Sequence, residues 1–148
     1  AYTYKSNTEA FYQKIRAYKN IVLVAITTNT HAMAAIRRLA HFLHENNINA
    51  PLLIKRDYDA DVSTQDLSLY AATDMGGNLI DGVGDGIWIA HHPTILAKEQ
   101  ALEHSKHINE VAFGILQAAR TRISKTEYIS CPSCGRTLFD LQETTAMI

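Results

Sequence analysis

Apolar residues recur at helical spacing in some segments of the chain and form short β-branched runs in others, which predicts alternating helices and strands. The continuous apolar run 21–27 is typical of a strand buried on both faces. Alternation at Leu67, Leu69 and Ala71 predicts a further strand. In chain order we expect helix 6–18, strand 21–27, helix 29–47, strand 52–54, strand 67–71, helix 73–80, strand 86–90 and helix 93–121.

This order of helices and strands is typical of an α/β fold with a mostly parallel sheet. About four strands are half of a closed eight-stranded barrel, so we expect a partial barrel-like layer structure. Thr73 and Asp74 are expected to cap the helix that follows them, and Gly82 to end it. Trp88 is expected to lie in the core. The polar segment 121–125 marks a domain boundary.

The composition narrows the class of protein. The 148 residues are 47% hydrophobic and 20% charged, which suits a globular core and excludes intrinsic disorder. The formal net charge of −1 gives no overall attraction to nucleic acid or anionic lipid, and no apolar run approaches the roughly 18 residues of a membrane span. Neither partner is therefore expected. The chain begins without Met and ends within an apolar-periodic stretch, so we expect a piece of a longer protein.

Cys131 and Cys134 form a C-x-x-C pair, the motif with the most chemical content. Two thiolates at this spacing can form a redox dithiol, or supply two ligands to zinc or to an iron–sulfur cluster. Both kinds of metal site need further ligands, which this sequence does not supply. Two idle thiols in a turn are a fourth interpretation, and the spacing by itself does not choose among the four.

Seven histidines raise the question of a second metal site, but no pair has a third ligand at a recognisable spacing. We therefore expect each pair to lie on a solvated surface. The pairs are His41 with His44, His91 with His92, and His104 with His107. The glycine-rich loop 82–86 precedes a strand instead of following one, so we interpret it as a tight connection and not as a phosphate-binding loop.

The stretch 125–143, which contains the C-x-x-C pair, resembles the start of the iron–sulfur domain of the 4-hydroxy-3-methylbut-2-enyl diphosphate synthases. This family belongs to the non-mevalonate isoprenoid pathway. A second stretch, 77–86, is similar to a family segment that lies upstream. One form of the family carries an extra, inserted barrel-like domain. The resemblance implies that residues 1–123 are the C-terminal part of this TIM-barrel-like domain, and that residues 124–148 start the small [4Fe–4S] cluster-binding domain.

The resemblance also implies a reaction. The family reductively converts 2-C-methyl-D-erythritol 2,4-cyclodiphosphate to 4-hydroxy-3-methylbut-2-enyl diphosphate, with electrons that pass from ferredoxin or flavodoxin through a [4Fe–4S] cluster. Cys131 and Cys134 match the first two of three cysteine ligands; the third cysteine and a glutamate ligand lie downstream in the family. Arg136 is expected to contact an anion, the cluster or a diphosphate, with a structural ion pair as the alternative.

One departure from the family pattern bears on the role of this part. In the family's catalytic barrel the strand that corresponds to residues 85–89 continues with an arginine, which is missing here. The resemblance therefore implies a structural role, no catalytic residue in this chain and no activity of the chain alone. Its expected partners are the remaining domains of the same protein and the electron donor, in the bacterial cytoplasm. A thioredoxin-like dithiol module and a zinc-stabilised interaction domain are the competing interpretations.

Overall fold

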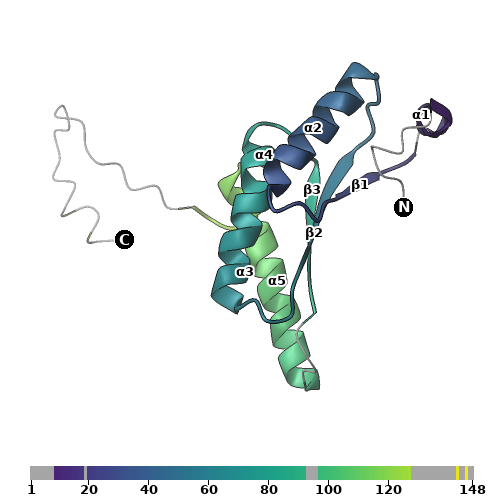
Figure 1. The fold of residues 1–148 in the computed structure, drawn as a ribbon. Coiled ribbons are helices and arrows are strands. Elements are labelled where there is room, and N and C mark those ends of the chain that lie inside the picture. The colour runs from purple at the N-terminus through teal and green to yellow at the C-terminus, as the bar shows by residue number, and fades with distance from the viewer. Residues whose placement is uncertain (1–8, 19, 93–96, 128–142, 144–145, 147–148) are drawn as a thin grey trace.

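A computed structural model describes residues 9–18, 20–92, 97–127, 143 and 146. Its centre is a parallel sheet of strand order β1-β2-β3, formed by β1 (Leu23–Ile26), β2 (Leu52–Tyr58) and β3 (Gly86–His91). The helices of the described part are α1 (Glu9–Ala17), α2 (Ala32–Glu45), α3 (Thr64–Ala71), α4 (Gly77–Ile80) and α5 (Lys98–Ala118). Figure 1 shows α2 to α5 gathered on one side of the sheet. The expected α/β fold with parallel strands is confirmed, and the described strands form no closed barrel.

An unbroken helical run joins α3 to α4 through a π-helical turn at Ala72–Gly76. The strand expected at 67–71 is therefore wrong. Thr73 and Asp74 lie inside the run and do not cap a helix. As a result, three strands alternate with helices in the described part, where four were expected.

The start of α3 explains why a helix forms there. The hydroxyl oxygen of Ser63 accepts a hydrogen bond from the Asp66 amide at 3.1 Å, which caps the helix. Leu67 and Ala71, four residues apart, are fully buried, whereas Leu69 is 62% exposed. Helical geometry places Leu67 and Ala71 on one face and turns Leu69 away from it. The apparent alternation came from the two buried residues and a chance apolar residue between them.

Two clusters of buried side chains hold the elements together. The larger cluster lies between the sheet and the helices α2 to α5, and joins every one of them. It consists of Ile36, Ile54, Leu67, Ala71, Met75, Leu79, Ile89 and Ile115. The smaller cluster packs α1 and the end of α2 against β1 and the start of β2, and consists of Tyr12, Ile15, Ala25, Leu43, Ile48 and Leu52.

The second face of the sheet has no helix of the described part over it. Register partners on neighbouring parallel strands share a face, so these side chains are assigned from the strand pairing. We define the open face as the side chains that this pairing places there: Val24, Ile26, Leu53, Lys55, Asp57, Trp88 and Ala90. Of these, Ala90 is buried. Val24, Ile26 and Trp88 are 42%, 57% and 50% exposed. The burial of 21–27 on both faces and the core position of Trp88, both expected from the sequence, are therefore wrong.

Two helices end where the sequence predicted. Helix α2 ends at Glu45, and Gly82 follows α4 with a φ of +73°, in the left-handed region that favours glycine. Helix α5 runs past His104 without a break. Among the described residues, every helix is too short or too polar to cross a membrane.

Candidate functional site

The loop before β3 packs its backbone closely against β2. The Asp85 amide donates to the Leu52 carbonyl at 2.8 Å, and the Asp85 carboxylate accepts from the Leu52 amide at 2.8 Å. Gly84 has a φ of +98°, and a Cβ there would lie 2.7 Å from the Cδ1 of Ile54. The Val83 amide is bonded as well, to a carbonyl of α4. The predicted tight connection is confirmed, since these amides are used inside the fold and not offered to a phosphate.

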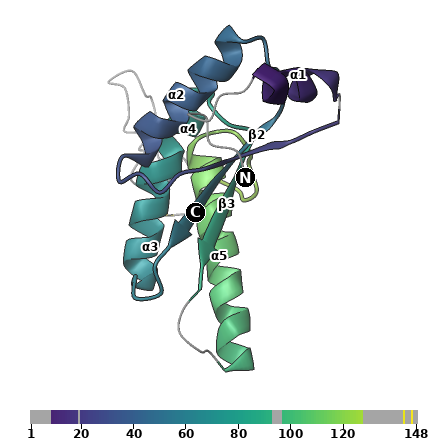
Figure 2. The same cartoon turned by 45° about the vertical axis from the view of Figure 1, so that its right-hand side comes forward.

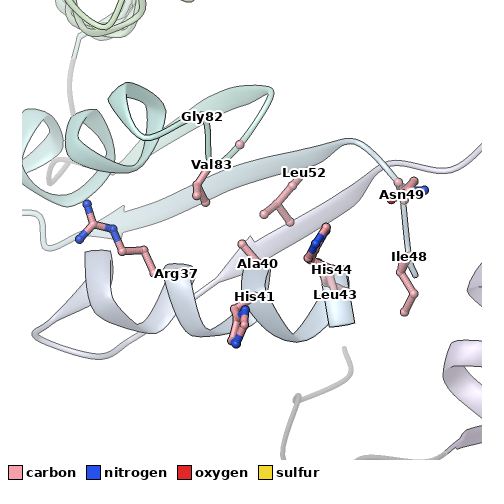
Figure 3. A pocket seen from close by; sticks show the side chains of 12 residues that line it. Arg37, Ala40, His41, Leu43, His44, Ile48, Asn49, Leu52, Gly82 and Val83 are labelled. Carbon is pink, nitrogen blue, oxygen red and sulfur yellow. The ribbon is translucent and has the colours of Figure 1, made fainter. Parts of the chain in front are cut away.

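A pocket of about 430 Å³ lies between α2 and this loop, at the edge where the strands begin (Figure 3). Arg37 on its rim is ion-paired with Asp81, and His41 lies 3.3 Å from Glu45. His41 and His44 are both exposed, as predicted for this pair. Because Arg37 and His41 already have carboxylate partners, the pocket gives no clear sign of an anion site.

Charged side chains gather at the opposite edge, where the strands end. We define the carboxyl-edge network as Thr27, Arg56, Tyr58 and Asp74. The Asp74 carboxylate accepts from the Arg56 guanidinium at 2.8 Å and from the Tyr58 hydroxyl at 3.1 Å. Arg56 also donates to the Thr27 carbonyl. Burial raises the pKa of Tyr58 well above its usual range, and the Asp74 carboxylate raises it further.

This network ties three segments that are distant in the sequence: the end of β1, the strand β2 and the π-helical turn. Ligands of open α/β sheets usually bind at the carboxyl ends of the strands. Here the Arg56 and Asp74 side chains are only 13% and 15% exposed and bind each other. Their arrangement is that of a structural tie. Sequence reasoning missed it because Asp74 was interpreted as a helix cap, although Arg56 and Tyr58 alternate along β2 in a way that puts both on one face.

His91 at the end of β3 meets His104 on α5, thirteen residues away. Nδ1 of His91 lies 3.1 Å from Nε2 of His104, and His91 is only 8% exposed. The solvated surface expected for the histidine pairs is therefore wrong for His91, and right for its exposed neighbour His92. Burial lowers the pKa of His91 below 6.5, and the nearby His104 lowers it further, while the Asp59 backbone and, more weakly, the Asp61 carboxylate act in the opposite direction.

The three predicted site residues, Cys131, Cys134 and Arg136, lie outside the described residues. Within the described part, no three His, Cys, Asp or Glu side chains come together in a way that could hold a metal ion. The contact of His91 with His104 is thus a pair of imidazoles and not a recognisable metal centre. The cysteine pair stays a prediction.

Comparison with known proteins shows which proteins the chain is related to. It is 40% identical over 141 residues to the 4-hydroxy-3-methylbut-2-en-1-yl diphosphate synthase (flavodoxin) of Porphyromonas gingivalis, which covers 95% of this chain and 22% of that protein. The chain is homologous to a segment of these synthases. The enzyme named 4-hydroxy-3-methylbut-2-en-1-yl diphosphate synthase (ferredoxin), chloroplastic, of Arabidopsis thaliana is 42% identical over 114 residues, which are 77% of this chain and 14% of that protein.

The family resemblance predicted from two stretches of sequence is thereby confirmed over almost the whole chain. The synthase (flavodoxin) of Bacteroides thetaiotaomicron, 37% identical over 145 residues, matches 98% of it. The chain spans about a fifth of the length of these bacterial relatives. No family model matches the chain, and no solved structure matches it.

Proposed function

We propose that this chain is part of a synthase that reductively converts 2-C-methyl-D-erythritol 2,4-cyclodiphosphate to 4-hydroxy-3-methylbut-2-enyl diphosphate in the bacterial cytoplasm. The observation that carries the proposal is the 37–42% identity to synthases of this name from bacteria and a plant. Flavodoxin and ferredoxin stand in the names of those relatives, and one of the two is the proposed electron donor. The isolated chain is expected to show no turnover, because it supplies only a fifth of the protein.

Residues 1–123 are proposed as the C-terminal part of an inserted TIM-barrel-like domain with a structural role. In such a barrel the helices lie outside and the inner faces of the strands pack on one another. The open face, with the exposed Val24, Ile26 and Trp88, has the apolar character of such an inner face. Strands outside this chain would then cover it. The carboxyl-edge network agrees with a structural role, since its charges are used internally.

Residues 124–148 are proposed as the start of the cluster-binding domain, with Cys131 and Cys134 as two ligands of a [4Fe–4S] cluster. The donors fit in kind, because thiolates are the usual ligands of such clusters. The remaining ligands come from outside this chain. When bound, the cluster supplies electrons to the reaction. Arg136 follows the second cysteine by two residues and is proposed to contact the anionic cluster or the diphosphate.

The decisive test is the iron and sulfide content of the complete parent protein, purified without oxygen. We expect about four irons and about four sulfides per chain. Both should be lost in Cys131→Ser or Cys134→Ser and kept in the control Ser133→Ala, which changes the residue between them. One zinc and no sulfide would replace this proposal with a structural zinc module. A reversible Cys131–Cys134 disulfide without metal would replace it with a dithiol redox module.

The role of Arg136 is tested by steady-state kinetics of the parent protein. Arg136→Ala is expected to raise KM for the cyclodiphosphate more than it lowers kcat, because the lost contact is to a bound anion. Arg136→Lys keeps the charge and should restore most of the affinity. Unchanged kinetics in Arg136→Ala would assign this residue to a structural ion pair instead.

A further inference from the structure

The residues that follow α5 are held against the helix by hydrogen bonds and side-chain contacts. Arg120 has a φ of +59°, which turns the backbone back at the end of the helix. The Leu116 carbonyl then accepts from the Thr121 amide at 3.0 Å, the Thr121 hydroxyl at 2.9 Å and the Arg122 amide at 3.2 Å. The Arg122 guanidinium lies 4.9 Å from the centre of the Phe113 ring, one turn further back along α5. Residues 121 and 122 are thus fastened to the helix by both backbone and side chain.

The Gln117 side chain holds Ser124 and Lys125. Its Oε1 accepts from the Ser124 amide at 3.2 Å, the Ser124 hydroxyl at 3.2 Å and the Lys125 amide at 3.0 Å. Its Nε2 donates to the Lys125 carbonyl at 3.2 Å. A single partly buried side chain therefore takes up both backbone polar groups of Lys125, as a neighbouring strand would do.

The last tie is an ion pair between Arg120 and Glu127, with 2.6 Å between Nη1 and Oε2. Both side chains are well exposed, so this pair contributes little by itself. Its position matters, because it holds Glu127, which lies only four residues before Cys131 in the sequence. We define the joint as residues 117–127, from Gln117 to the end of these contacts.

We propose that Gln117 is a positioning residue, which makes the joint rigid and so fixes the direction in which the chain runs toward Cys131 and Cys134. The positional consequence rests on the proposed cluster-binding function; the joint itself does not. A flexible chain from residue 119 to 131 would span about 19 Å, whereas one from 127 to 131 would span about 11 Å. The joint therefore narrows the space open to the cysteine pair, on whose position electron transfer through the proposed cluster depends.

The joint is tested first in the 148-residue chain, by amide hydrogen exchange. Gln117→Ala should speed exchange at Ser124 and Lys125 by about tenfold, because three acceptor contacts and one donor contact are lost together. The matched control is Lys106→Ala, an exposed position on the same helix, which should leave both amides unchanged. Gln117→Glu keeps the acceptor oxygen and should show an intermediate rate. Unchanged exchange in Gln117→Ala would overturn the joint.

The positioning role is tested in the complete parent protein. Gln117→Ala should lower kcat several-fold while KM and iron content stay at the wild-type level, and Gln117→Glu should recover part of kcat. Faster exchange with unchanged kcat would overturn the positioning role and leave the joint. A wild-type parent without iron would refute the proposed function, and the exchange data would still report on the joint, so the two failures are distinguishable.

Discussion

The two faces of the sheet are made by the same three strands and have opposite surroundings. On the covered face Ile54 and Ile89 are enclosed by α2 to α5. On the open face Val24, Ile26 and Trp88 are exposed. Figure 2 shows the strands of the sheet in front of α5. Both faces carry large apolar side chains, so hydrophobicity alone does not distinguish them. What differs is whether helices of this chain cover the side chain.

Parallel sheets are normally covered on both faces, because the helices that connect their strands pack there. In this chain all connecting helices of the larger core lie on one side. The Nζ of Lys55 stands 4.9 Å from the centre of the Trp88 ring, which only partly shields it. The covered face stabilises this chain, whereas the open face contributes little until something outside the described residues covers it. Two predictions test this contrast directly, and two more test polar contacts made by Arg56, Tyr58 and His91 on the covered face.

The largest effect is expected from Ile54→Ala on the covered face. Ile54 is fully buried in the larger core, so truncation should lower the free energy of unfolding by about 2–5 kcal/mol. Urea unfolding of the chain measures this. Val24→Ala on the open face of the neighbouring strand is the matched control and should cost less than about 1 kcal/mol. Equal losses at the two positions would contradict the contrast between the faces.

Asp74→Asn should lower the free energy of unfolding by about 2 kcal/mol, because it leaves the largely buried Arg56 guanidinium without its carboxylate partner. The same unfolding measurement applies. Tyr58→Phe removes the second donor to Asp74, and combining it with Asp74→Asn should cost less than the sum of the two single changes. Full additivity would mean that the carboxyl-edge network does not act as a unit.

The pair of His91 and His104 should make the free energy of unfolding depend on pH. This effect should be smaller than those of the two preceding changes. The pKa of His91 is lowered in the folded state, so the unfolded chain binds a proton more readily. The free energy of unfolding should therefore fall as the pH falls below about 6.5, and should be constant above it. Urea unfolding at several pH values measures the trend. It should weaken in His91→Asn and persist in His44→Asn, a change at an exposed histidine; an equal trend in both variants would argue against the pair.

The smallest effect is expected from Trp88→Ser on the open face. In this chain the free energy of unfolding should fall by less than about 1 kcal/mol, since the substitution removes only an exposed ring and a cation–π contact. Thermal unfolding of the chain is the measurement. A loss as large as that of Ile54→Ala would show that Trp88 is covered in solution. In the complete parent protein the same change should cost considerably more if strands from outside this chain cover the face.

Local patterns in the sequence predicted much of the fold. The apolar runs at β1, β2 and β3, the end of α2 near Glu45 and the turn at Gly82 all depend on residues within a few positions of each other. The tight loop before β3 was predictable for the same reason, since glycine permits the φ of +98° at Gly84. The family resemblance likewise rests on contiguous stretches, and comparison confirmed it.

Other features were decided only by the tertiary structure. A spacing of four at Leu67 and Ala71 suits a strand and a helix equally, and the helix forms because that face packs into the larger core. Trp88 and Ile26 are as apolar as Ile54, yet only the side on which the helices pack determines which of them is buried. The pairing of Arg56 with Asp74, and of His91 with His104, joins residues from different elements. A contact of this kind depends on how the chain folds back on itself, which no local pattern encodes.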